Sequence, residues 1–224
     1  SAMAFVRVFC LVSVALAGTA VDITCDEGSM NETCVVVNQT LHWNESGAVT
    51  KVRGYLVLRS SAIIVPETTP LKVESSIEWT ISAKGVNVTK GSQIVVNGLF
   101  VESETLLVDP TSSIRAFAAF KYQRGNAQET MSGGGGRGGA GAFACYGSFQ
   151  AGEAFGNPFE VDLSPGGFGA TPNTLGIGGR GGGVINLNTT IANIHGVVNA
   201  SGGVSTQSHI DTGGGAGGTV VIIA

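Results

Sequence analysis

The sequence predicts an all-β protein built as a stack of coils, in the manner of a parallel β-helix, with very little helix. A glycine block of the form G-[R/A]-G-G occurs three times, and each copy leads into a short, largely apolar segment: 136–144, 179–187 and 215–223. Short segments rich in β-branched and aromatic residues recur between polar turns. Beyond the N-terminal 20 residues, no segment sustains apolar residues at helical spacing with caps. A glycine turn that repeatedly feeds an apolar strand is typical of repeat architectures.

The composition supports a folded, charge-poor protein. Glycine accounts for 35 of 224 residues, and charged residues for only 12%, about half of the roughly 25% usual in soluble domains. Because 43% of the residues are hydrophobic, the chain has the apolar surface that a disordered polymer lacks. The formal net charge of −4 gives no electrostatic footprint for nucleic acid.

Residues 1–20 are interpreted as a signal peptide. A short basic region around Arg7 precedes the apolar run 8–17, and small residues at 15–20 offer cleavage sites. The run is shorter than the ~20 residues that span a bilayer, and an uncleaved anchor is the alternative. Ser1 and Ala2 precede the natural start and are interpreted as a cloning scar or an upstream reading frame.

Glycosylation motifs and cysteines point to the same compartment. Six N-x-[S/T] sequons predict N-glycosylation at Asn31, Asn38, Asn44, Asn87, Asn188 and Asn199. Cys25 and Cys34 enclose a short polar segment, and we expect a disulfide between them that ties an N-terminal segment at 21–45. Cys145 is then unpaired, and burial as a small hydrophobe, pairing with a partner and pairing with a missing part of the chain stay open.

The segment 46–224 is expected to form the β-helix. Strands are predicted within 52–58, 77–81, 93–97 and 99–101, and after the glycine blocks. We expect the turns between coils at Gly136, Gly138, Gly139, Gly179, Gly181, Gly182, Gly215, Gly217 and Gly218. A second pattern, Φ-x-G-x-Φ, is centred on Gly54, Gly98 and Gly196. At ~20–25 residues per coil, these distances predict two coils and then four.

Residues 146–177 interrupt this rhythm and predict a long loop that protrudes from the stack. Pro158, Pro165 and Pro172 lie within this stretch, and proline cannot donate to a strand ladder. Long loops on a rigid scaffold often bind ligands, and a disordered excursion is the alternative. The apolar segment 220–224 has no cap after it, so we expect a chain truncated at its C-terminus, with an end that allows self-association.

No motif predicts a catalytic, cofactor or metal site. The G-x-G-x-x-G matches at 133–138 and 176–181 do not open a helix, and two R-G-G units in an acidic chain are too few to bind RNA. The glycine blocks lack the Asp of calcium-binding nonapeptides. The three histidines, His42, His195 and His209, share no metal-ligand spacing. The carboxylate pairs Glu102/Glu104 and Glu160/Asp162 would each share a strand face, which suits acid–base catalysis or a solvated surface.

The glycine blocks at 133–144, 178–187 and 213–224 resemble those of glycine-rich secreted or surface proteins with a right-handed parallel β-helix, and the architecture is similar to that of the pectin-lyase-like superfamily. This resemblance implies the right-handed fold. Pectin-active members carry clustered Asp residues with Arg or Lys, or an N-x-D…D-D…G-H-G set. Here only Asn193-Ile-His195-Gly196 is similar to part of that set, and no D-D occurs. The resemblance therefore implies no activity.

These observations predict a secreted or cell-surface glycoprotein with a structural, adhesive or glycan-binding role. Its partners would be extracellular glycans or proteins, with no nucleic acid, no cofactor, no metal and no membrane span. Enzymatic activity stays open, with the balance against it. One alternative is a polysaccharide lyase or hydrolase whose catalytic residues lie in a missing C-terminal part. The other is the ectodomain of a membrane receptor.

Overall fold

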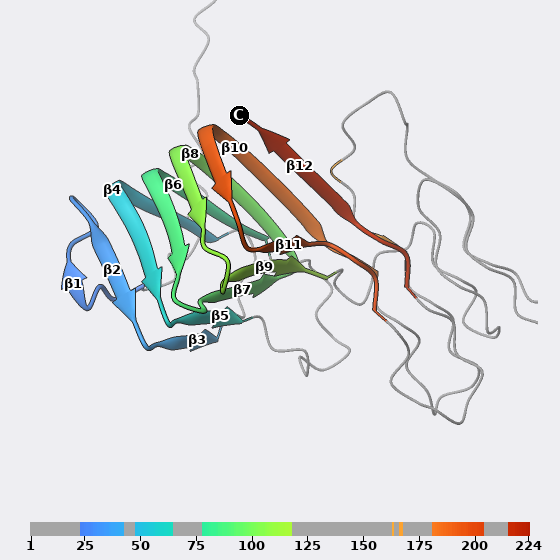
Figure 1. Cartoon of the computed structure of the whole chain (residues 1–224), viewed down its shortest axis with the longest axis horizontal. Helices are drawn as coiled ribbons and strands as arrows, with labels where there is room; N and C mark the ends of the chain where they lie inside the picture. Colours follow the sequence, from blue (N-terminus) through green and yellow to red (C-terminus); the bar gives the residue numbers. More distant parts are fainter. Residues whose placement is uncertain are drawn as a thin grey trace, which may run out of the picture.

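The protein is all-β in the part of the chain that its computed structural model describes. That part comprises residues 23–42, 48–64, 78–117, 163, 166–167, 181–203 and 215–224, and every regular element within it is a strand. The strands form a larger sheet in the order β1-β2-β4-β6-β8-β10-β12 and a smaller sheet in the order β11-β9-β7-β5-β3 (Figure 1). The predicted signal peptide, Asn44, Cys145, His209 and most of 118–180 lie outside the described residues.

Successive strands from β2 to β12 alternate between the two sheets. The larger sheet contains β1 (Glu27–Gly28), β2 (Cys34–Val37), β4 (Ala48–Arg59), β6 (Glu78–Thr89), β8 (Gly98–Val108), β10 (Val184–Ile194) and β12 (Thr219–Ile223). The smaller sheet contains β3 (Thr40–His42), β5 (Ala62–Ile64), β7 (Gln93–Val96), β9 (Ser113–Ala116) and β11 (Val197–Asn199).

Every strand pair is parallel except β1 with β2. Parallel strands need a crossover connection, and here each crossover contains a strand of the other sheet. The step between paired residues is 22 residues from Cys34 to Leu56 and 20 from Trp79 to Leu99. It is 35 residues from Val184 to Thr219. Where the interval is longer, additional residues lie in the connection between the two paired strands. The strands themselves still pair in register.

The long strands bend partway along their length (Figure 1). In β6 the buried positions are odd-numbered before the bend and even-numbered after it. In β6, Trp79 and Ile81 are buried before the bend, and Val86 and Val88 after it. A regular strand alternates faces with period 2, so one additional residue in the bend is needed to return the apolar side chains to the core. The pairing of β4 with β6 shifts register between Val52 and Tyr55 at the same level. A shift of this kind is typical of a β-bulge.

The core consists of columns of apolar side chains that run from strand to strand. One column in the larger sheet contains Ile81, Val101 and Leu187, which are in register on β6, β8 and β10. The smaller sheet supplies Ile63, Ile94 and Ile114, also in register and fully buried. Burying one such side chain is favourable by about 1.5–3 kcal/mol relative to leaving it exposed to water. The columns explain why strand positions with β-branched residues recur along the chain.

Buried serines form the corner between the two sheets. Ser61, Ser92 and Ser112 each precede a strand of the smaller sheet and are at most 2% exposed. The Ser61 backbone N–H donates to the Ser92 Oγ at 3.2 Å, and the Ser61 Oγ donates to the Val36 carbonyl at 3.0 Å. Asn38, Ser60 and Lys90 have φ values of 53°, 51° and 55° at the same corner. These hydrogen bonds satisfy polar groups that a tight corner would otherwise leave buried without partners.

The glycine segments that precede β10 and β12 pack backbone against backbone. A Cβ added at Gly182 would lie 1.7 Å from the Ala200 carbonyl oxygen, and one at Gly218 would lie 1.9 Å from the Gly183 carbonyl oxygen. Only glycine permits such an approach. Gly181, Gly182, Gly215, Gly217 and Gly218 lie in these two segments, whereas Gly136, Gly138, Gly139 and Gly179 lie outside the described residues.

Two residues of the predicted protruding loop lie against this glycine corner. The Gly166 N–H donates to the Gly182 carbonyl at 2.7 Å, and the Ala216 N–H donates to the Gly167 carbonyl at 2.9 Å. Both Gly166 and Gly167 are buried. At these positions the chain packs on the stack because glycines allow backbone hydrogen bonds at close range.

The Φ-x-G-x-Φ spacing agrees with the strand pairing over its first interval, where β4 to β8 is two steps, and was wrong over its second. Gly54 lies in the bend of β4, Gly98 is the first residue of β8, and Gly196 lies between β10 and β11. The 98 residues from Gly98 to Gly196 span one step, since β10 pairs directly with β8. An added Cβ would lie 1.7 Å from the Glu32 carbonyl oxygen at Gly54 and 2.3 Å from the Asp109 carbonyl oxygen at Gly196.

Candidate functional site

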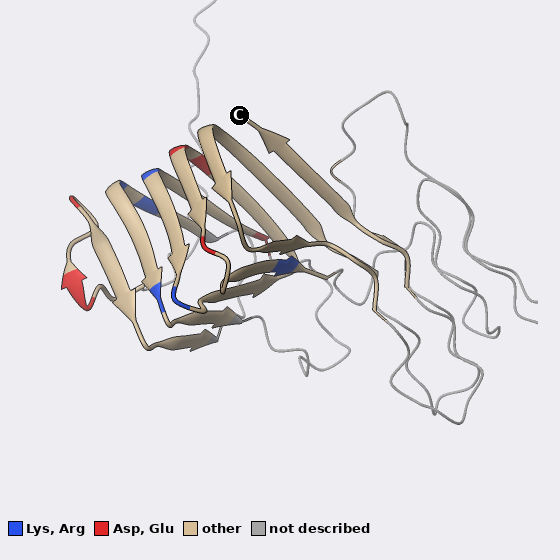
Figure 2. Ribbon diagram, in the orientation of Figure 1, with Lys and Arg blue, Asp and Glu red and all other residues tan. Residues whose placement is uncertain are grey.

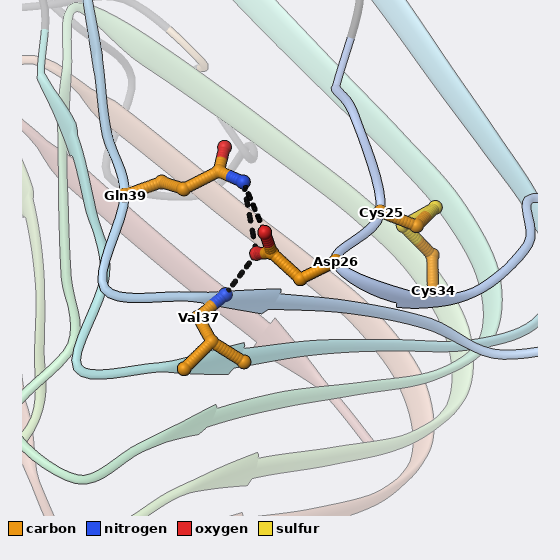
Figure 3. Close-up of a disulfide and its surroundings, with 5 residues drawn as sticks. All are labelled: Cys25, Asp26, Cys34, Val37 and Gln39. Carbon is orange, nitrogen blue, oxygen red and sulfur yellow. Dashed lines mark hydrogen bonds between the residues drawn. A yellow bond between two sulfur atoms is a disulfide. The ribbon is translucent and has the colours of Figure 1, made fainter.

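The N-terminal segment lies at one end of the stack. A disulfide joins Cys25 to Cys34, as the sequence predicts, with a Cα–Cα distance of 5.1 Å (Figure 3). It ties the turn that carries β1 onto β2, and β1 pairs antiparallel at the edge of the larger sheet. The Arg53 N–H donates to the Met30 carbonyl at 2.9 Å, so the same segment crosses over the bend of β4. The segment therefore covers β4 from Arg53 to Arg59 at this end of the larger sheet.

Asp26 links this cap to the first corner. Its carboxylate accepts hydrogen bonds from the Val37 backbone N–H at 2.6 Å and from the Gln39 Nε2 at 2.8 Å (Figure 3). Because both donors lie where the chain turns from β2 into β3, the carboxylate holds the hairpin against the corner. Charge-assisted hydrogen bonds of this kind are stronger than neutral ones.

The outer face of the larger sheet, defined as its side away from the core, carries polar and charged side chains in register. Lys51, Ser82, Glu102 and Asn188 occupy one row across β4, β6, β8 and β10. Figure 2 shows Lys and Arg on β4 and β6, and Asp and Glu along β8 and at β1. β6 carries both the exposed Glu78 and the exposed Lys84, so charges of both signs occur across the sheet. Such a face is suited to an extended partner that makes many small contacts.

The five sequon asparagines in the described residues differ in exposure. Asn31 and Asn38 are exposed beside β1 and β2, and Asn188 is exposed on β10. Asn87 in β6 and Asn199 in β11 are half-buried. The Asn199 Oδ1 accepts from the Ser201 backbone N–H at 2.6 Å.

The candidate acid–base and metal residues do not gather in the described part of the chain. Glu102 and Glu104 are both exposed on β8, and His195 is exposed after β10. Glu160 and Asp162 lie outside the described residues. Within the described ranges, no three His, Cys, Asp or Glu side chains are close enough to hold a metal ion together.

The pKa of Asp109 is lowered by the hydrogen bonds that its carboxylate accepts. Partial desolvation alone would raise the pKa of Asp109, but the Ser112 hydroxyl beside it and hydrogen bonds from Lys90 and Thr111 lower the pKa to about 2. The donors include the Thr111 backbone N–H at 2.9 Å and the Thr111 Oγ1 at 2.8 Å. Donors that favour the charged form lower a carboxyl pKa. The carboxylate joins two stacked turns and is a structural group.

No protein-family model, curated protein or solved structure matches this chain. In the described residues, no helix is long and apolar enough to cross a membrane. The function is therefore inferred from the surfaces themselves, namely the N-terminal end, the outer face and the opposite end of the stack.

The sequence contained a better marker of the stack than its glycines. Within the described residues, the tripeptide Ser-x-Ile occurs at 61–63, 92–94 and 112–114, where the serine forms the corner and the isoleucine enters the core. It was missed because the three copies are 31 and 20 residues apart. A repeat with unequal spacing does not stand out against a fixed period.

Proposed function

We propose that this protein is a secreted or cell-surface glycoprotein with a structural or adhesive role. Its coils would form a right-handed parallel β-helix, and its outer face would bind extended glycans or proteins. The proposal assigns binding to Lys51, Ser82 and Glu102 of the outer row and to the side chains around them, beside the Asn188 sequon.

Two features of the topology support the β-helix. Consecutive strands alternate between two sheets, and each strand pairs in parallel with the strand two positions further along the chain. Crossovers between parallel strands of one sheet are right-handed in about 98% of cases. A stack of right-handed coils is the simplest path that satisfies both features.

The observation that carries the binding role is the regular outer face. Parallel strands lie about 4.8 Å apart, so the row of four in-register residues spans about 14 Å without a break. An extended ligand can contact successive strands of such a row. The mixture of exposed cations on β4 and β6 and exposed carboxylates on β8 favours polar or ionic ligands.

The disulfide and the sequons support an extracellular location. Disulfides persist in oxidising compartments, and the Cys25–Cys34 pair lies in the segment that caps the stack. Three sequon asparagines, Asn31, Asn38 and Asn188, are exposed, as a glycan acceptor requires.

Binding to an array of extracellular glycans and to matrix proteins tests this proposal. A double variant, Lys51→Glu with Glu102→Lys, inverts the charges of the row while keeping the net charge. We expect it to lose most of the binding that the wild-type protein shows. Arg115→Glu, an exposed charge on the smaller sheet, is the matched control and should bind as the wild type does.

The proposed role is overturned if the wild-type protein binds no member of either set. It is also overturned if Arg115→Glu loses binding and the inverted row retains it, because the ligand would then contact the smaller sheet.

A further inference from the structure

The outer face of the larger sheet carries an apolar patch beyond the bend of its strands. Val35, Val57 and Leu107 lie in one row across β2, β4 and β8. The residues on either side of each are at most 1% exposed and belong to the core, so the row itself faces outward. Val57 and Leu107 are half-buried. Contiguous apolar side chains on an outer surface are often covered by a binding partner.

The ring of Tyr55 extends this patch onto β6. Val86 and Val88 are fully buried, so the alternate positions Gly85 and Asn87 face outward. An added Cβ at Gly85 would meet the Tyr55 Cδ1 at 2.5 Å, which places the ring where a side chain of β6 would project. Gly85 is buried under the ring, whereas Tyr55 itself is half-buried. The ring therefore lies on the sheet with part of its apolar surface open to solvent.

Asn87 lies in the middle of the patch. It pairs with Val57 on one side and with Leu107 on the other. Positions 85 and 87 are about 7 Å apart along the strand, at ~3.3 Å per residue, so the Tyr55 ring lies within reach of a group attached to Asn87. Asn87 begins the sequon Asn-Val-Thr and is half-buried. A sugar attached to its amide nitrogen would start among apolar side chains.

The first sugar of an N-glycan suits these neighbours chemically. N-acetylglucosamine has a pyranose ring whose C–H groups form an apolar face, and its hydroxyl groups lie around the rim. A sugar that lies flat on the sheet buries this face against aromatic and aliphatic side chains and keeps the hydroxyl groups in water. A free sugar would lose translational freedom on binding, whereas an attached one is already held beside the patch.

We propose that the N-glycan on Asn87 packs on this patch, with its first N-acetylglucosamine on the Tyr55 ring and on the side chains of Val57 and Leu107. The glycan covers the outer face beyond the bend and stabilises the sheet there. The proposal rests on the proposed extracellular glycoprotein and assigns a role to one of its modification sites.

A glycan at this place leaves the outer row free to bind a ligand. Ser82, the residue that β6 contributes to that row, precedes Asn87 by five residues, which corresponds to about 16 Å along a strand. The two parts of the outer face therefore have different occupants, an attached sugar beyond the bend and an external ligand before it.

The first test uses the full chain secreted from glycosylating cells. Peptide mass spectrometry measures occupancy at Asn87, and thermal unfolding followed by circular dichroism gives the midpoint. We expect Asn87→Gln to lower the midpoint by about 2–4 °C, because the patch loses its cover. Asn31→Gln removes an exposed sequon from the turn between β1 and β2. It is the control, and its midpoint should change by less than about 1 °C.

A double-mutant cycle assigns this effect to the ring. In a Tyr55→Leu background, Asn87→Gln should shift the midpoint by less than half as much, because the aromatic contact is already gone. In a Tyr55→Phe background, which keeps the ring, the shift should equal that of the wild type. An effect of the Asn-to-Gln replacement that does not involve the ring would appear equally in all three backgrounds.

Iodination of tyrosine is a second measurement, and it needs no substitution at Tyr55. A sugar on the ring hinders the reagent, so Asn87→Gln should raise the iodination rate of the Tyr55 peptide severalfold. The inference is overturned if Asn87 carries no glycan, if the midpoint shift is the same in the wild type and in Tyr55→Leu, or if the iodination rate does not change.

Failure of this inference can be told apart from failure of the proposed function. If Asn87 carries no glycan while other sequons do, the inference fails and the glycoprotein stands. If no sequon carries a glycan, both fail. The charge-inverted outer row is scored on ligand binding alone, so a lack of ligand binding leaves the contact between the Asn87 glycan and Tyr55 intact.

Discussion

Gly85 is the residue in β6 over which the ring of Tyr55 lies. An added Cβ would meet the Tyr55 Cε1 at 2.4 Å and the Thr105 Oγ1 at 2.5 Å. Tyr55, Gly85 and Thr105 are in register on adjacent strands. A glycine inside a strand often marks such a close approach, and here the aromatic ring covers the backbone at the bend.

Replacing this glycine tests the contact. We expect Gly85→Ala to lower the free energy of unfolding by about 1–3 kcal/mol, because overpacking forces the ring from its position. Urea denaturation followed by circular dichroism measures the change. Adding Tyr55→Ala should recover part of the loss, since the two residues are in contact.

The control for this substitution is Gly217→Ala. An added Cβ at Gly217 has nothing within 4 Å, so the change should be within about 0.5 kcal/mol of the wild type. Equal destabilisation by both substitutions would contradict a specific role for the Tyr55 ring.

At the scale of elements, the disulfide-tied hairpin of β1 and β2 lies at the first edge of the larger sheet. The loop between Cys25 and Cys34 is short, with a sequence separation of 9. Met30 and Ile23 pack against the core from this segment. The cap therefore combines a covalent closure with apolar contacts to the first strands.

Removing the disulfide is expected to destabilise this end. The double variant Cys25→Ser/Cys34→Ser should lose about 2–3 kcal/mol, from the loop-closure entropy of so short a loop. Urea denaturation under oxidising conditions measures the loss. The wild type under reducing conditions, which also lacks the disulfide, is measured for comparison. A stability equal to that of the oxidised wild type would show that apolar contacts alone hold the cap.

The stacked turns at Lys90 and Asp109 give the fold a pH-dependent contact. The pKa of Asp109 in the folded state, about 2, lies below the ordinary value of 3.8. Its contribution to stability is therefore present above pH 4 and is lost as pH falls from about 4 toward 2. Protonation removes the charge that the donors favour.

Asp109→Asn isolates this contribution. We expect the wild type to have the higher thermal midpoint above pH 4 and the difference to shrink toward pH 2. Glu102→Gln, which also removes one exposed carboxylate, is the control. A constant difference between wild type and Asp109→Asn down to pH 2 would contradict the assignment.

Columns of side chains run across the larger sheet as far as β12, the last strand in the described residues. Ile81 and Ile222 occupy one column, with Val101 and Leu187 between them. Ile81 is fully buried and Ile222 is 48% exposed. An isoleucine side chain therefore contributes more to stability at position 81 than at position 222.

The matched pair Ile81→Ala and Ile222→Ala tests this gradient. We expect the first to cost about 2–5 kcal/mol, as a cavity in a closed core does, and the second less than 1 kcal/mol. Urea denaturation of both variants gives the comparison. Similar losses would contradict this gradient.

By itself, the sequence determined the all-β class, the Cys25–Cys34 pair and the strands that follow Gly183 and Gly218. Each of these depends on local chemistry, namely β-branched residues, two cysteines nine residues apart and glycines before an apolar run. The sequence also contained the sequons and the Ser-x-Ile corners. The tripeptide alone is a weak signal, because it recurs at 75–77 and at 208–210, both outside the described residues.

Only the tertiary structure decided which strands are neighbours. The steps of 20, 22 and 35 residues between partners hide the repeat, because insertions lengthen a coil without altering the register of the sheet. For the same reason the sequence placed four coils between Gly98 and Gly196, where the sheet has one step. The outer row and the packing of β2 on β4 follow from that pairing, since residues far apart in the chain meet only when parallel strands align.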